Sequence, residues 1–192
     1  HLAELKRYDE ADAEMADAAR LEPPSPSYHC VLGRVRSLAG RTEEAREQYR
    51  AALRLSIDND LAVSELMQLA PGRPERRDEL EFVEAELALQ PHLGEGVIAY
   101  FGHAVHTLEA HEVHKALQEL LDARPDLWQT WSTMTQQLLA MERFPEARAL
   151  AEQAIDRFPM LPRLWLDRAD VCAATGDDDG QIEALRQALR IS

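Results

Sequence analysis

The chain has 192 residues, of which 21 are basic and 35 acidic, so its formal net charge is −14 with neutral histidines. Its mix of 45% hydrophobic and 29% charged residues excludes a disordered or fibrous protein. No apolar run approaches the roughly 18 residues of a membrane span, so direct membrane insertion is not expected. The acidity argues against a general nucleic-acid binder, which needs a basic face to displace counterions. The two cysteines, Cys30 and Cys172, predict no disulfide framework.

Prolines and alanines recur along the chain with a period of 34 residues. The prolines are Pro23, Pro91, Pro125 and Pro159, and Ile57 fills the one vacant place. Two series of alanines keep the same period: Ala11, Ala45 and Ala147, and Ala18, Ala52, Ala154 and Ala188. The period divides the chain into a partial unit 1–25, full units 26–59, 60–93, 94–127 and 128–161, and a final unit 162–192. A period of this length indicates stacked repeats.

Each unit is predicted to contain two helices. In residues 144–158, for example, apolar side chains recur at three- and four-residue steps, which is typical of an amphipathic helix. Thr42 is expected to cap the second helix of its unit, and Asp177 the corresponding helix of the last unit. Gly40 and Gly176 stand between paired helices, where a left-handed residue is needed. No segment alternates with period two, so an all-α protein without strands is predicted.

This helix–turn–helix pattern resembles the tetratricopeptide repeat family over the whole chain. The residues that carry the resemblance best are Leu32, Gly33, Gly40, Ala45, Tyr49 and Ala52 in unit 26–59, and Trp131, Phe144, Ala147, Ala154 and Pro159 in unit 128–161. The resemblance implies a right-handed superhelical solenoid of about five and a half repeats, forming one domain over residues 1–192. Small residues at the helix crossings would let the backbones approach, and large residues would fill the gaps beside them.

The two central full units, 60–93 and 94–127, depart from this pattern. Glu79 and Val113 replace a small alanine of the second helix, and Met67 replaces the small residue represented by Gly33. Pro71-Gly72-Arg73-Pro74 is expected to end a first helix early and to leave an unusual loop. One interpretation is drift in repeats that still stack through volume-preserving exchange. The other is a locally splayed centre that carries a specific pocket.

The resemblance also implies a concave groove, lined by the first helices, that binds a peptide or a partner helix. Ten residues are expected to line it: Arg34, Glu65, Gln68, Ile98, Val105, Ser132, Gln136, Leu139, Leu166 and Asp170. Amides on this face can bond the backbone of an extended segment, and apolar pockets can select its side chains. Some family members clamp a C-terminal carboxylate with lysine and asparagine, a set that this chain lacks. The alternative is that these residues are only solvated helix faces.

Four of the seven histidines lie in unit 94–127: His103, His106, His111 and His114. Their spacing places the first two on one helix face and the last two on another. Such imidazoles can bind zinc, copper or nickel, or act together as a pH switch. His103 and His114 fall where the repeat buries side chains, so a hydrogen-bonded structural role is the default and a metal or proton sensor is the alternative.

No nucleophile elbow, phosphate loop or dinucleotide fingerprint occurs, so neither catalysis nor a bound cofactor is predicted. The first hypothesis is a protein-interaction scaffold whose groove binds a peptide or a partner domain. The alternative is a regulatory or docking arm of a larger enzyme or assembly, and the third hypothesis is the histidine sensor.

The chain begins midway through a repeat and ends on a second helix without an evident capping helix. Because solenoids need capped ends for solubility, we expect either a fragment of a longer chain or a homo-oligomer stacked through its uncapped ends. No charged-then-apolar signal peptide follows His1, which favours a cytoplasmic location if the native chain begins there.

Overall fold

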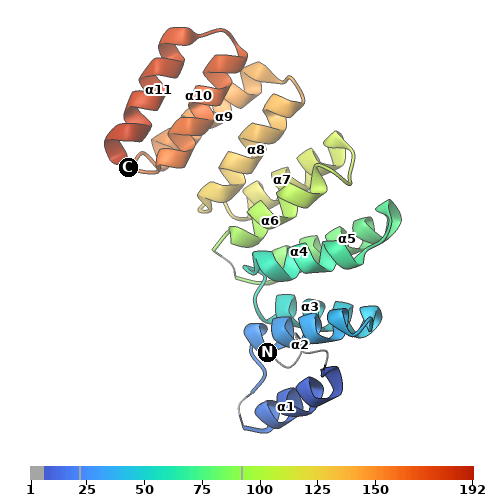
Figure 1. The fold of residues 1–192 in the computed structure, drawn as a ribbon. Coiled ribbons are helices and arrows are strands. Elements are labelled where there is room, and N and C mark those ends of the chain that lie inside the picture. Colours follow the sequence, from blue (N-terminus) through green and yellow to red (C-terminus); the bar gives the residue numbers. More distant parts are fainter. Residues whose placement is uncertain (1–6, 22, 92) are drawn as a thin grey trace. The chain divides into compact units, whose positions relative to one another are not determined.

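The computed structural model describes residues 7–21, 23–91 and 93–192, and within these ranges it contains eleven α-helices and no strand (Figure 1). The all-α prediction is therefore confirmed for the described part of the chain. The helices are α1 (Tyr8–Leu21), α2 (Pro26–Leu38), α3 (Thr42–Leu55), α4 (Asp60–Leu69), α5 (Arg73–Leu89), α6 (Glu95–Ala104), α7 (Ala110–Ala123), α8 (Trp128–Ala140), α9 (Phe144–Arg157), α10 (Pro162–Ala174) and α11 (Asp178–Ile191).

After α1, the helices come in pairs, and most of their starting points keep the 34-residue period. The first helices α2, α8 and α10 begin at residues 26, 128 and 162, and the second helices α3, α9 and α11 begin at residues 42, 144 and 178. One period therefore corresponds to one helix pair. Prolines mark the end of most periods: α7 and α9 stop two residues before Pro125 and Pro159, because proline cannot continue a helix.

The turns between paired helices confirm two predictions and correct a third. Gly40 and Gly176 have φ angles of 76° and 70°, in the left-handed region. The Asp177 side chain accepts a hydrogen bond from the backbone N–H of Gly180, as expected of an N-cap. Thr42, however, is the first residue of α3 and not its cap. Arg41 takes the cap position, because its carbonyl accepts the first hydrogen bond of α3, from the N–H of Ala45.

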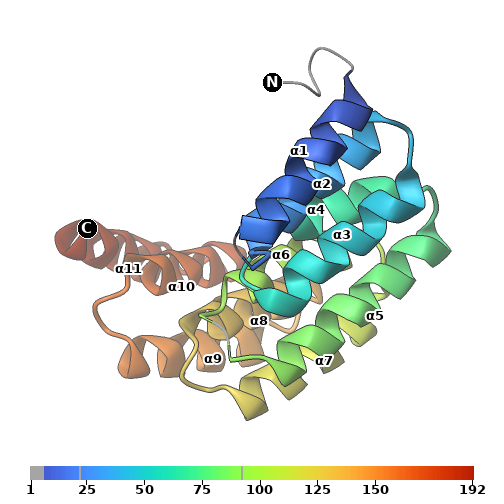
Figure 2. The same ribbon diagram turned by 90° about the horizontal axis from the view of Figure 1, so that it is seen from below.

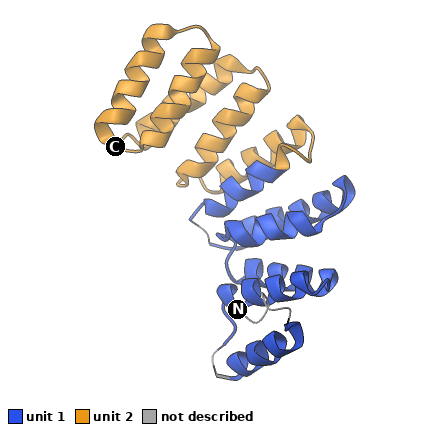
Figure 3. Cartoon of the chain, viewed as in Figure 1, with its two compact units in different colours: residues 1–103 blue, residues 104–192 orange. Residues whose placement is uncertain are grey.

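The chain forms two compact parts, which we call unit 1 (residues 1–103) and unit 2 (residues 104–192); the 34-residue repeat units keep their residue ranges as names (Figure 3). Unit 1 contains α1 to α5 and all but the last residue of α6, and unit 2 contains α7 to α11. Within unit 1 the second helices α3 and α5 run side by side (Figure 2). Within unit 2 the first helices α8 and α10 contact each other, and α9 packs against both.

In unit 1 the close approach of α2 and α3 depends on Gly33. A Cβ atom at this position would lie 3.0 Å from two ring atoms of Tyr49, so the space beside the glycine is already filled by the phenol ring. Tyr49 is 1% exposed, and Ala45 and Ala52, one turn away on either side, are fully buried. The crossing thus pairs the smallest residue of one helix with an aromatic ring of the other.

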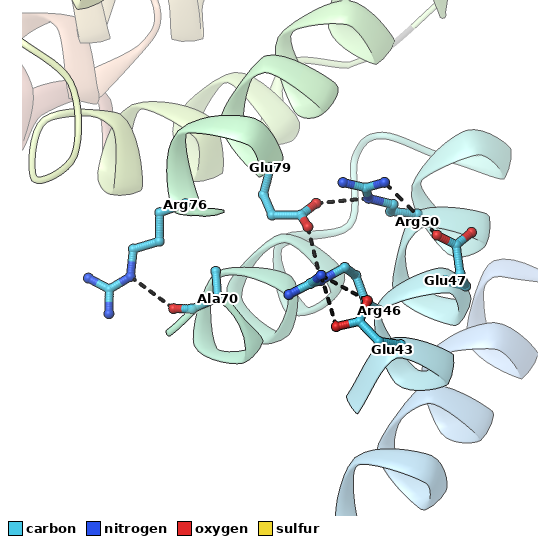
Figure 4. Close-up of polar contacts among 7 residues, drawn as sticks. All are labelled: Glu43, Arg46, Glu47, Arg50, Ala70, Arg76 and Glu79. Carbon is cyan, nitrogen blue, oxygen red and sulfur yellow. Dashed lines mark hydrogen bonds and ion pairs between the residues drawn. The ribbon is translucent and has the colours of Figure 1, made fainter. Parts of the chain in front are cut away.

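The early end of the first helix in unit 60–93 is confirmed, but the unusual loop is not. Helix α4 has 10 residues, whereas α2 has 13. The connection to α5 nevertheless covers only residues 70–72, the same length as the connection between α2 and α3, because α5 begins early and extends to 17 residues. Arg76 of α5 donates from Nε to the carbonyl of Ala70 at 3.4 Å and so satisfies a backbone group beyond the end of α4 (Figure 4).

Glu79 of α5 occupies a place that is alanine in other units, and it is 2% exposed. Its carboxylate meets two guanidinium groups of α3: Nε of Arg50 at 2.9 Å and Nε of Arg46 at 3.2 Å (Figure 4). A buried carboxylate is costly unless it is paired. The two arginines, whose side chains are 25% and 18% exposed, supply that pairing and join α3 to α5.

In unit 2 two tryptophans repeat one contact with the period of the sequence. The indole Nε1 of Trp131 donates to the carbonyl of Pro125 at 3.0 Å, and that of Trp165 donates to the carbonyl of Pro159 at the same distance. Trp131 belongs to a buried cluster with Leu121, Ala154, Ile155 and Leu164. Each proline carbonyl is thereby fixed to the first helix that follows it.

Both cysteines, Cys30 and Cys172, are buried and free. No helix in the described ranges combines the length and the hydropathy that crossing a membrane requires.

Candidate functional site

Four of the ten residues expected to line a groove belong to unit 1, on the first helices α2, α4 and α6. Arg34 and Gln68 are exposed, Glu65 is half-buried, and Ile98 is 39% exposed. This part of the inner-helix face therefore offers two polar side chains and one aliphatic side chain to a ligand.

Glu65 lies at the centre of a polar cluster in unit 1. The hydroxyl of Tyr49 donates to Oε2 of Glu65 at 3.5 Å, and Nδ2 of Asn59 donates to Sγ of Cys30 at 3.4 Å. Burial raises the pKa of the Tyr49 phenol and of the Cys30 thiol, and the nearby charge of Glu65 acts in the same direction on both. Both groups therefore stay protonated at neutral pH and act as hydrogen-bonding groups. The sequence prediction missed Tyr49 and Asn59, since neither lies on a first helix.

The other six predicted groove residues belong to unit 2. Leu166 and Val105 are 39% and 37% exposed, and Asp170 is also exposed. Gln136 and Leu139 are half-buried, and Ser132 is only 4% exposed.

A polar bridge between α8 and α10 explains why Ser132 and Gln136 are withdrawn from solvent. Oδ1 of Asp167, which is 1% exposed, accepts from Nε2 of Gln136 at 3.2 Å and pairs with Arg163 at 3.0 Å. Nε of Arg163 in turn donates to Oγ of Ser132 at 3.3 Å. Burial raises the pKa of the Asp167 carboxyl, and its polar neighbours oppose this shift. Ser132 and Gln136 thus help to hold α8 and α10 together. We call the face of the first helices on which the predicted groove residues lie the inner face.

The bridging residues Arg163 and Asp167 were not among the predicted site residues. Their opposite charges are four residues apart on α10, a spacing that places them on one helix face. Leu166 and Asp170 lie next to them in the sequence and are exposed. The four-residue spacing could therefore have identified Arg163 and Asp167 as site residues, because the predicted groove residues of α10 lie in the same stretch of the helix.

The histidines do not form a metal centre in the part of the chain that the structure describes. No group of three or more histidine, cysteine, aspartate or glutamate side chains there is placed to hold an ion. In unit 1, Nε2 of His103 lies 3.4 Å from Oγ of Ser64. In unit 2, His106 and His111 are exposed, and Nε2 of His114 lies 2.9 Å from a guanidinium nitrogen of Arg143. The hydrogen bonds of His103 and His114 fit a structural role.

His114 of α7 is tuned toward its neutral form. Burial is the main cause that lowers the pKa of its imidazole, and the positive charge of Arg143 adds to it, while Glu146 opposes both. Because Arg143 donates from its guanidinium, the neutral imidazole must accept at Nε2. This contact joins α7 to the turn before α9.

The family of the chain follows from its sequence. The tetratricopeptide repeat model matches residues 1–60 and 136–192, more than half of the chain, and the protein belongs to this family. The unmatched stretch, residues 61–135, contains nearly all of the two central units that depart from the pattern. Comparison with curated protein sequences finds no match.

Solved structures share the fold at low sequence identity. A protein named YrrB, described as a tetratricopeptide repeat protein with an unusual peptide-binding site, is 14% identical with a TM-score of 0.53, over 93% of this chain and 92% of that chain. PilW, a type IV pilus biogenesis factor, is 16% identical with a TM-score of 0.56, over 97% and 86%. The C-terminal part of a repeat protein from Cytophaga hutchinsonii is 13% identical with a TM-score of 0.56, over 100% and 80%.

Acidification should destabilise the protein partly through His114. Its folded state binds a proton less readily than the unfolded chain, so this stability is present at neutral pH and is lost as the pH falls through the lowered pKa of the imidazole. We expect His114→Gln to reduce the fall in melting temperature between about pH 7.5 and about pH 5, measured by circular dichroism. The exposed His111→Gln variant should behave as the wild type. Identical pH dependence in His114→Gln and wild type would contradict this role.

Proposed function

We propose that the chain is an interaction scaffold that acts by binding, not by catalysis, and that the inner face of its first helices binds a peptide or a partner domain of another protein. The observation that carries the proposal is the wall formed by α8 and α10. There the exposed side chains of Leu166 and Asp170 flank Asp167, whose bonds to Gln136 and Arg163 fix the two helices to each other.

The chemistry of this wall suits an extended segment. An apolar side chain of the segment would pack on Leu166 and the half-buried Leu139, and a backbone N–H or a basic side chain would reach the carboxylate of Asp170. Because the polar bridge already holds the wall in place, binding loses less free energy to the ordering of side chains. The same face would serve if the repeats form a docking arm of a larger enzyme or assembly.

Selection from a random peptide library on the purified chain tests the proposal. Peptides that bind the wild type should lose about tenfold or more in affinity for the double variant Leu166→Ser/Asp170→Asn, measured by fluorescence anisotropy. The matched control is Leu38→Ser/Glu14→Gln, which also removes one exposed leucine and one exposed acidic charge, at residues outside the proposed surfaces. Selected peptides that bind both double variants with wild-type affinity would reject the inner face as the binding site.

A second proposal concerns self-association through α11. Three of its apolar side chains are exposed: Ile182 at 46%, Leu185 at 38% and Leu189 at 79%. One period earlier, on α9, the same places hold Arg148, Ala151 and Ile155.

Those three residues of α9 face the next helix pair. Arg148 pairs with Asp177 at 3.1 Å and bonds Thr175, while Ala151 and Ile155 are 1% and 8% exposed. The equivalent side chains of α11, by contrast, are exposed in this structure. We propose that a second copy of the chain covers them, so that copies stack end to end.

Sedimentation equilibrium tests the stacking proposal. The wild type should associate as its concentration rises, and Leu185→Ser/Leu189→Ser should shift the sedimenting species toward the monomer, since each leucine contributes about 2 kcal/mol when buried. Leu38→Ser/Met160→Ser, which removes two other exposed apolar side chains, is the control. A wild-type monomer at every concentration would overturn the proposal.

A further inference from the structure

Four leucines of unit 1 are more than half exposed where the helices α3 and α5 end. Leu55 is the last residue of α3, Leu89 is the last residue of α5, Leu61 lies in the first turn of α4, and Leu93 precedes α6. Their exposed fractions are 53%, 78%, 53% and 79%. The ends of α3 and α5 lie on the same side of unit 1 in both ribbon views (Figures 1 and 2). We call these four residues the leucine edge.

Hydrogen bonds fix the two segments that carry the leucine edge to each other. The Gln90 side chain accepts from the N–H of Ile57 at 3.1 Å and donates to the carbonyl of Leu53 at 2.8 Å. The Asp58 carboxylate accepts from the N–H of Gly96 at 2.9 Å and also from the N–H of Leu93. The connection that follows α3 and the connection that follows α5, on which the leucines lie, are thus held to each other by hydrogen bonds.

The positions of unit 2 that are equivalent to Leu89 and Leu93 do not hold an exposed leucine. One period after Leu93 stands Leu127, which is 7% exposed, and Ala123 and Arg157 stand one and two periods after Leu89. The repeat thus has a buried place for a leucine that Leu93 does not occupy. The exposure of the leucine edge is specific to unit 1 and is not a requirement of the fold.

Charges beside the leucine edge indicate which partner fits. Asp60 and Glu95 are exposed next to Leu61 and Leu93, and neither forms an ion pair within the described ranges. The cation nearest in sequence to Leu55, Arg54, lies over the ring of Phe82 at 5.3 Å. Two copies of this acidic chain meeting here would bring like charges together, whereas a basic segment would find complementary charge.

We propose that the leucine edge is a docking surface for an amphipathic segment of a partner protein, with apolar side chains flanked by lysine or arginine. This surface goes beyond the proposed inner-face function, since it is formed by helix ends and connections. Burial of the exposed leucines supplies the affinity, because removing apolar side chains from water is favourable. Asp60 and Glu95 orient the segment through its basic residues.

Model peptides test the proposal by fluorescence anisotropy on the intact chain. We would use fluorescein-labelled amphipathic helices of about 16 residues, roughly four turns, built from leucine and lysine, from leucine and glutamate, or from alanine and lysine. The leucine–lysine peptide should bind best. Leu89→Ser/Leu93→Ser should weaken it about tenfold or more, and Asp60→Asn/Glu95→Gln should weaken it about threefold and reduce its salt dependence.

Leu38→Ser/Met160→Ser is the matched control, with two exposed apolar residues removed elsewhere, and it should bind as the wild type does. The proposal would be overturned if Leu89→Ser/Leu93→Ser bound the leucine–lysine peptide as tightly as Leu38→Ser/Met160→Ser does. It would also be overturned if the alanine–lysine peptide bound the wild type as tightly as the leucine–lysine peptide, because net charge alone would then explain the binding. Peptides selected for the inner face should bind Leu89→Ser/Leu93→Ser normally, so the two surfaces can fail independently.

Discussion

The close approach of two paired helices is the constraint on which the rest of the structure depends. In unit 1 it is met by Gly33 against the ring of Tyr49, with the contact already at 3.0 Å for an added Cβ. Small residues recur at the crossings of the units that keep the family pattern, and this recurrence is part of the 34-residue period. The period in turn places the first helices of successive units beside one another, as α8 and α10 show. The inner face that we propose as a binding site follows from this regular placement.

The central units keep the helix pairing although their sequences leave the family pattern. Met67 and Val83 stand one period after Gly33 and Tyr49, and they are 4% and 0% exposed. The larger side chain of the pair thus lies on the first helix here and on the second helix in unit 26–59. This supports the interpretation of drift by volume-preserving exchange in this unit. The buried charge of Glu79 is compensated in another way, by ion pairs with two arginines of the preceding repeat unit. A family model built on local residue patterns does not recognise such compensation between distant positions.

The sequence predicted most of the fold because its period carries local information. The pairing of helices in each period, the left-handed Gly40 and the cap at Asp177 each depend on a few neighbouring residues. The sequence did not predict contacts made across the fold. The pairing of Arg163 and Asp167 with α8 and the exposure of Leu93 are set by tertiary packing. Leu93 is the clearest case, since its equivalent Leu127 is buried by the same repeat.

The unfolding free energy of a Gly33 variant tests the central constraint most directly. Gly33→Val should cost about 2 kcal/mol or more in urea denaturation, because the added side chain must displace the buried ring of Tyr49. Gly102→Ala is the matched control: among the described residues, no atom outside the adjoining backbone of its own helix lies within 4 Å of an added Cβ, so the variant should gain up to about 1 kcal/mol. A Gly33→Val protein as stable as the wild type would contradict the account, because the crossing would then tolerate any side chain.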